Sequence, residues 1–120
     1  MLLRLLASAA LIGLSLHPSS ASESGVVIVA RMTAKPGQEA PLSERLRDAS
    51  VHCPEEPGCS GFDVYRDNAN PRRFVLVERW RSQADLERHW GHPWVKAFFD
   101  SRIELLEADI DATFVTRVAP

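Results

Sequence analysis

The segment from Glu56 to Phe98 most constrains what this chain can fold into, because two alternating stretches and a helix follow one another there without a break. The stretches Gly61 to Arg66 and Arg73 to Arg81 are rich in β-branched and aromatic residues, and residues 67–71 (DNANP) between them have the composition of a turn. Ser82 then stands at the position of a helix N-cap. The segment therefore predicts a β-hairpin that leads directly into a helix.

The flanking residues extend this pattern into a complete small domain. Val26 to Thr33 is rich in β-branched residues and predicts a first strand, and Gln38 to Val51 has apolar residues at helical spacing. The helix that Ser82 opens is interrupted near Pro93 and continues beyond it, and Ile110 to Val118 alternates as a last strand. The order is β-α-β-β-α-β, which is an α+β, ferredoxin-like arrangement.

The strand from Arg73 to Arg81 has two largely apolar faces, because side chains alternate along a strand. One face carries Phe74, Leu76, Glu78 and Trp80, and the other carries Val75, Val77 and Arg79. A sheet with one face in water should show polar residues on that face. We therefore expect helices on one face and a second copy of the sheet on the other.

The chain contains several short motifs in a fixed order. They are the turn Pro57-Gly58-Cys59, the hairpin tip Asn70-Pro71, the strand Phe74-x-Leu-x-Glu-x-Trp80, the helix Ser82-x-x-x-Leu-Glu-x-His89 and the segment Pro93-Trp94. Together these motifs resemble those of the antibiotic biosynthesis monooxygenase superfamily. The resemblance extends from Val26 to Val118. It implies the ferredoxin-like fold and a homodimer in which two sheets form a shared α/β-barrel.

The N-terminus has the layout of a secretory signal peptide. A basic Arg4 precedes an apolar run from Leu5 to Leu16, and small residues end at Ala21. The apolar run has about a dozen residues, whereas a membrane-spanning helix needs roughly 20, which disfavours the alternative of a retained anchor. We expect a signal peptide over residues 1–21, a domain over 22–120, a periplasmic or secreted location, and no stable membrane insertion after cleavage.

Composition excludes several classes of function. The formal net charge is -2 and no basic stripe remains to neutralise phosphates, so nucleic acid is not an expected partner. The sequence has no GxGxxG, P-loop, Gly-x-Ser-x-Gly or His-Glu-x-x-His motif. We therefore expect a pocket without cofactor or metal. A domain of about 100 residues buries only about 60 to 65% of its surface, so a partner subunit would stabilise it.

Cys53 and Cys59 flank the turn between the first helix and the second strand. In an exported protein they could form a disulfide, or they could be two unpaired small apolar residues. A metal site is disfavoured on sequence grounds, because two cysteines without matching ligands nearby do not fill a tetrahedral site.

Glu78, His89 and Trp80 are the candidate catalytic residues. Leu76 and Trp80 direct Glu78 toward an apolar layer, which favours either a base with a raised pKa or an ion pair with Arg31, Arg79 or a helix arginine. The resemblance places His89 where relatives often have a cavity-facing histidine that orients or deprotonates a hydroxyl group; the alternative is a packed residue. Trp80 matches a family tryptophan at a pocket wall.

Phe62, Phe98, Trp94 and His92 are the candidate substrate-binding residues. The three aromatic side chains suit a flat aromatic ligand, although they could equally form an ordinary core. His92 departs from the family pattern, because here histidine precedes Pro93 and tryptophan follows it.

The resemblance implies a cofactor-independent monooxygenase acting on a phenol or quinol, a small aromatic molecule, with His89 or Glu78 as base and Trp80 as wall. The alternative from another class is a non-catalytic periplasmic dimer that binds a hydrophobic small molecule. Haem degradation, known among relatives, is disfavoured because Ala30 and Phe98 or Phe99 stand where asparagine and histidine would be needed. A sugar-phosphate isomerase would need a basic phosphate site, and the sequence offers none.

Overall fold

The computed structural model describes residues 25–120, so the predicted signal peptide lies outside the described residues. The elements are β1 (Val26–Thr33), α2 (Glu39–His52), the short 3-10 helix η2 (Cys53–Glu55), β2 (Cys59–Arg66), β3 (Arg73–Trp80), α3 (Gln83–Trp90), α4 (Pro93–Leu105) and β4 (Asp111–Val115). The strands form one antiparallel sheet in the order β2-β3-β1-β4. The predicted ferredoxin-like fold is confirmed, with its second helix divided into α3 and α4. No helix within residues 25–120 combines the length and apolar character needed to span a membrane.

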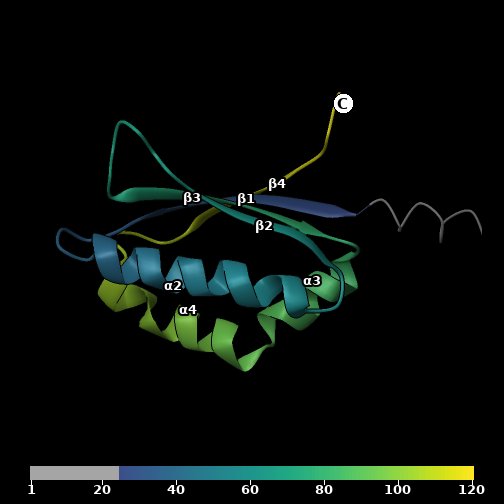
Figure 1. The fold of residues 1–120 in the computed structure, drawn as a ribbon, viewed down its shortest axis with the longest axis horizontal. Coiled ribbons are helices and arrows are strands. Elements are labelled where there is room, and N and C mark those ends of the chain that lie inside the picture. Colours follow the sequence, from purple (N-terminus) through teal and green to yellow (C-terminus); the bar gives the residue numbers. More distant parts are fainter. Residues whose placement is uncertain (1–24) are drawn as a thin grey trace, which may run out of the picture.

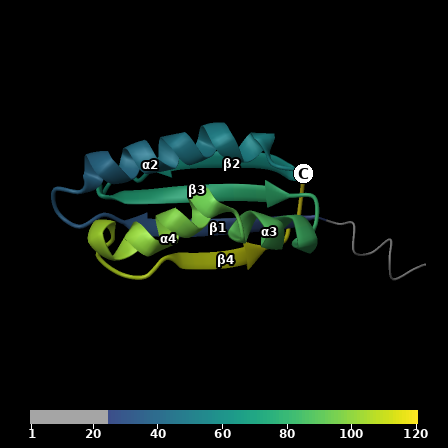
Figure 2. The same ribbon diagram turned by 90° about the horizontal axis from the view of Figure 1, so that it is seen from below.

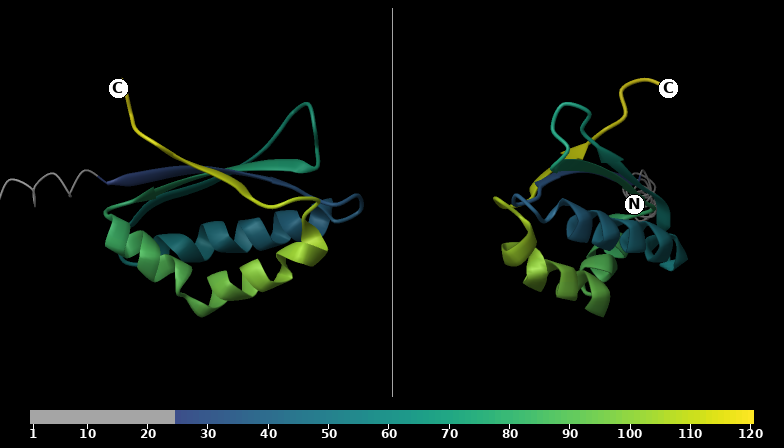
Figure 3. Two further views of the ribbon diagram at one scale, coloured as in Figure 1. Left: turned by 180° about the vertical axis from the view of Figure 1, so that it is seen from behind. Right: turned by 60° about the vertical axis from the view of Figure 1, so that its left-hand side comes forward.

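Helices α2, α3 and α4 all lie on the same face of the sheet (Figures 1 and 2). Figure 3 shows the opposite face without a covering layer in residues 25–120, and the C-terminal segment runs away from the helices on that side. The uncovered face carries the partly exposed side chains of Val29, Val75 and Val77. The helices confirm the predicted cover of one face, and the second copy of the sheet expected on the other face stays a prediction.

The core lies between the helices and the sheet. Alternation along β3 turns Phe74, Leu76 and Trp80 toward the helices, and these side chains are 1 to 2% exposed. Leu42 and Leu46 of α2 are also buried, because residues four apart lie on the same face of a helix.

The last strand is shorter than the predicted Ile110–Val118. Strand β4 pairs with β1, and the pairing ends at Val115 opposite Val27. Because β1 itself begins at Val26, residues beyond Val115 have no neighbouring strand to pair with.

Helix α3 begins at Ser82 as predicted, and Asp85 secures this end. The Ser82 hydroxyl accepts a hydrogen bond from the backbone N–H of Asp85 at 3.2 Å. The Asp85 carboxylate is 2% exposed and accepts hydrogen bonds from the Arg81 and Arg88 guanidinium groups and from the Ser82 hydroxyl, at 2.7 to 2.9 Å. The hydrogen bonds from the Arg81 guanidinium hold the pKa of Asp85 well below its usual range. Burial of the carboxylate acts in the opposite direction, and the hydrogen bonds from Arg88 and Ser82 lower the pKa further. Asp85 thus joins β3 to the start of α3.

Replacing Asp85 with asparagine is expected to lower the melting temperature at neutral pH by several degrees. The carboxyl has a lowered pKa in the folded state, so its stabilising effect is present above its ordinary value of 3.8 and disappears as the pH falls through the folded value. Thermal unfolding of both proteins across the acid range measures the difference, which should be largest near neutrality and shrink in acid. Because Arg81 and Arg88 are exposed, solvent screens their charges and limits the size of the difference in melting temperature. A difference in melting temperature that grows in acid would contradict the lowered pKa of Asp85.

Candidate functional site

A cavity of about 270 Å³ lies between the helices and the sheet. Three of the predicted substrate-binding residues, Phe62, Trp94 and Phe98, line it, together with both predicted bases, Glu78 and His89. Most of the remaining lining is aliphatic or aromatic and comes from β1, β3, β4, α2 and α4. The strands and helices therefore assemble an apolar chamber with two titratable side chains in its wall.

His89 lies in that wall because α3 turns it inward beside Leu86, three residues earlier on the same helix face. Its side chain is 5% exposed. Nδ1 forms a 2.9 Å hydrogen bond with Oε1 of Glu56, and Nε2 lies 3.8 Å from Oε1 of Glu78. A buried imidazole thus stands between two carboxylates that come from different parts of the chain.

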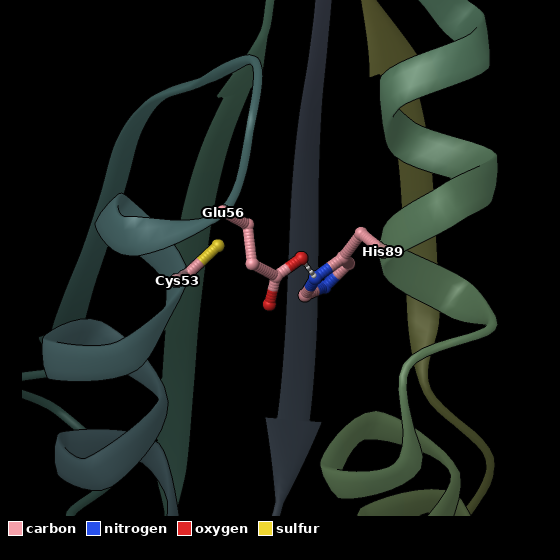
Figure 4. Close-up of side chains that lie close together, drawn as sticks. All are labelled: Cys53, Glu56 and His89. Carbon is pink, nitrogen blue, oxygen red and sulfur yellow. Dashed lines mark hydrogen bonds and ion pairs between the residues drawn. The ribbon is translucent and has the colours of Figure 1, made fainter.

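Glu56 is the site residue that sequence reasoning missed. It belongs to the turn between η2 and β2, and its carboxylate points across the cavity end to His89 (Figure 4). Its second oxygen, Oε2, accepts a hydrogen bond from the indole Nε1 of Trp94 at 3.0 Å. Glu56 therefore fixes both the imidazole and the cavity-lining indole. The only local signal is its place just before Pro57-Gly58, which does not indicate a contact 33 residues away.

Trp80 lies behind the site and not along the cavity surface. Its ring is 4.5 Å from the His89 ring between centroids, and its indole Nε1 donates to Oε1 of Glu78 at 3.1 Å. The Trp94 ring packs edge-on against His89 from another side, at 5.4 Å. Trp80 is 1% exposed, so it supports Glu78 and His89 where the sequence analysis predicted a wall in contact with the ligand.

Of the two alternatives for Glu78, the ion pair with Arg31, Arg79 or a helix arginine is not formed within residues 25–120. Strand alternation turns Arg79 to the other face of the sheet, where it pairs with Asp63 at 2.9 Å, and Arg31 lies on the same outer face. Glu78 instead faces His89 and Trp80. Burial raises the pKa of Glu78, while the Trp80 hydrogen bond and the charge of His89 oppose that rise.

His92 lies outside the cavity. It is exposed and occupies the N-cap position of α4, where the following Pro93 starts the helix. Its ring comes within 6.1 Å of Trp94 between centroids, and His92 lines a separate pocket together with Glu56 and Trp94. The predicted ligand contact of His92 therefore does not lie in the apolar chamber.

Three potential metal ligands also meet at this end of the cavity. Ligand atoms of Cys53, Glu56 and His89 all lie within 4.8 Å of one another (Figure 4), and Sγ of Cys59 is 3.2 Å from Sγ of Cys53. This placement supplies the nearby ligands that the sequence did not reveal. Both oxygens of Glu56 and Nδ1 of His89 are nevertheless occupied by their own hydrogen bonds. The absence of a metal from the working protein stays a prediction.

The geometry suits proton abstraction from a hydroxyl group. When Nδ1 carries the proton shared with Glu56, Nε2 of His89 is the free acceptor. A carboxylate behind an imidazole fixes its orientation and stabilises the imidazolium that forms. The apolar lining excludes water, which strengthens electrostatic interactions between these groups and a bound ligand.

Replacing Glu78 with glutamine is expected to stabilise the protein increasingly as the pH rises. Glu78 has a raised pKa when folded, so above its ordinary value of 4.5 the wild type loses unfolding free energy until the folded carboxyl has ionised. Glutamine has no such loss and retains an acceptor for Trp80. Urea unfolding at several pH values measures the difference, with Glu44→Gln on the exposed surface of α2 as control. A difference independent of pH would show that burial does not govern this carboxyl.

Together, the sheet order and the helices on one face define a ferredoxin-like α+β domain, with the buried His89 in the wall of its apolar chamber. The sequence profile described as antibiotic biosynthesis monooxygenase matches residues 25–101, and the chain belongs to this family. Family membership and the names of relatives support a monooxygenase-like function.

Three relatives illustrate the similarity. Rv0793 of Mycobacterium tuberculosis, named as a monooxygenase candidate, is 30% identical over 97 residues, or 81% of this chain and 92% of that protein. The structure of PA3566 from Pseudomonas aeruginosa has a TM-score of 0.76 and 28% identity, covering 82% of this chain and 98% of that one. The Synechocystis protein sll1783 is 25% identical over 81 residues, which span 68% of this chain and 55% of that protein. The chain thus spans nearly all of the first two relatives and about half of the third.

Proposed function

We propose that this protein is a cofactor-independent monooxygenase that oxidises a small phenol or quinol with O2 inside the cavity. The observation that carries the proposal is the buried His89, held by Glu56 and facing an apolar chamber lined with aromatic side chains. The family assignment supports the same class of reaction.

In the proposed reaction, Nε2 of His89 accepts the proton of a substrate hydroxyl group. The resulting anion delocalises its charge onto a ring carbon, which can pass an electron to O2 and then combine with the reduced oxygen. The imidazolium returns its proton as water leaves. For a hydroquinone, one oxygen atom enters the ring to give a hydroxyquinone and the other becomes water, so the substrate supplies all four electrons that reduce O2.

The cavity volume suggests the size of the substrate. An engineered apolar cavity of about 150 Å³ holds one benzene molecule, and the chamber here has about 270 Å³. Two fused aromatic rings fit this space, with Phe62, Trp94 and Phe98 available to pack against them. We infer a preference for one- and two-ring phenols over tricyclic ones.

The working form is proposed to be an exported homodimer. The uncovered sheet face and the small size of the domain support a second subunit, and the layout of residues 1–21 supports export. These proposals are independent of the chemistry at His89.

The test is oxygen uptake by purified protein, freed of flavin and metal, with a series of hydroquinones and naphthols. Uptake in proportion to protein, fastest with two-ring substrates, is the expected result. Tryptophan fluorescence measured without oxygen reports binding separately, because Trp94 lines the cavity. Quenching by these compounds without any uptake would instead favour the alternative of a binding protein.

A further inference from the structure

Cys53 and Cys59 lie in direct contact behind the proposed proton-accepting site. Their sulfur atoms are 3.2 Å apart, with Cys53 at the start of η2 and Cys59 at the start of β2. Cys53 is fully buried, whereas Cys59 is partly exposed. A disulfide requires the sulfurs to approach to about 2.05 Å, a small movement for two side chains that already touch.

The turn between these cysteines holds Glu56 by its backbone. The Glu56 N–H donates to the carbonyl of Cys53 at 2.9 Å, and the Glu56 carbonyl accepts from the N–H of Cys59 at 3.2 Å. Gly58 completes the turn with a φ of 85°, which glycine adopts readily, and its carbonyl accepts from the N–H of Arg81 at 2.7 Å. Each cysteine is therefore one backbone hydrogen bond away from Glu56.

The side chain of Glu56 carries this restraint into the cavity. Its two oxygens bind Nδ1 of His89 and Nε1 of Trp94, and both of these residues line the chamber. Figure 4 shows the Cys53 sulfur and the Glu56 carboxylate on the same side of His89. A covalent bond between Cys53 and Cys59 would restrict the motion of the turn. Because Glu56 binds His89 and Trp94, it would also restrict the motion of these two side chains.

We propose that Cys53 and Cys59 form a disulfide that clamps the Glu56 turn, so that the thiol state of this pair sets how firmly His89 and Trp94 are held. Only the catalytic purpose of this positioning rests on the proposed function. The clamp itself is a property of the fold and can be measured without turnover. Glu56 is on this view a positioning residue.

The oxidation balances as two thiol–disulfide exchanges with a low-molecular-weight disulfide. Cys59, the more accessible thiol, loses its proton and attacks the external disulfide, which releases one thiol and leaves a mixed disulfide on Cys59. Cys53 then loses its proton and displaces the second external thiol, which forms the Cys53–Cys59 bond. Because Cys53 is fully buried and Cys59 is partly exposed, the second step should be the slower one.

The experiment compares the protein equilibrated in oxidised and in reduced glutathione. Mass spectrometry counts the thiols, and NMR measures hydrogen exchange at the three indole N–H groups, assigned with Trp→Phe variants. We expect loss of two hydrogen atoms on oxidation and about tenfold slower exchange at Trp94, because local opening of the turn becomes rarer. The indole of Trp80, which is bonded to Glu78 on β3, is the internal control and should change little.

Single variants Cys53→Ala and Cys59→Ala keep the second thiol but cannot close the bond. Both should show the Trp94 exchange rate of the reduced protein even in oxidised glutathione. The proposal is overturned if no intramolecular disulfide forms, if added Co²⁺ gives thiolate-to-metal absorption at these cysteines instead, or if Trp94 exchange is the same in both states. Absence of oxygen uptake would count against the proposed reaction alone, since the exchange measurement involves no substrate.

Discussion

Replacing His89 with alanine is expected to reduce oxygen uptake about 100-fold or more, because general-base catalysis contributes roughly 10² to 10⁴ to a rate. His89 is the cavity-lining imidazole, and Glu56 holds it with Nε2 directed toward the Glu78 side of the chamber. The apolar lining remains in the variant, so quenching of tryptophan fluorescence by a naphthol should persist. Steady-state uptake and anaerobic quenching together separate the loss of turnover from the loss of binding.

His92→Ala is the matched control for that measurement, because it removes the same side chain from an exposed position outside the cavity. It should retain nearly full uptake. Glu56→Gln should fall between the two, since the amide preserves the shape of the side chain while removing the charge that stabilises the imidazolium. Full activity of His89→Ala would transfer the role of base to Glu78, the other candidate in the cavity wall.

If the proposed homodimer forms through the uncovered sheet face, replacing Val77 with lysine is expected to separate it into monomers. Val77 pairs with Val29 in the middle of the sheet, on the face that the helices leave uncovered (Figure 3). Burying an unpaired ammonium group between two sheets costs several kcal/mol, which is a large part of the free energy of a modest interface. Light scattering after gel filtration measures the mass of each protein at micromolar concentration.

Ala40→Lys on the exposed surface of α2 controls for the added charge and should leave the mass unchanged. In the monomeric Val77 variant we also expect a lower melting temperature, because so small a domain gains stability from covering its second apolar face. A wild-type protein that is monomeric at these concentrations would contradict the proposed assembly, and a dimeric Val77→Lys would place the interface elsewhere.

Local patterns in the sequence predicted the fold well. The alternation of side chains along β3 correctly predicted that Phe74, Leu76, Glu78 and Trp80 face the helices. Ser82 was correctly predicted as the N-cap of α3. Such features depend on neighbours within a few residues, which a single sequence displays. The length of β4 was overestimated because it depends on where its partner β1 begins.

The site was predicted less completely, because its geometry depends on contacts between distant segments. His89 and Glu78 were recognised as candidates, but Glu56 was not, since nothing local indicates that its turn faces α3. The alternative of an ion pair for Glu78 is not realised for a related reason. The sequence offered several arginines, whereas the fold gives Arg79 to Asp63 on the other face.

The measurement that tests the proposed chemistry most directly is single turnover of a hydroquinone under ¹⁸O₂ with protein freed of flavin and metal. The proposed reaction predicts one ¹⁸O atom in the hydroxyquinone and one in water, with both products lost in His89→Ala. Unlabelled quinone, formed with or without protein at the same rate, would show that the chamber around His89 does not direct oxygen into its ligand.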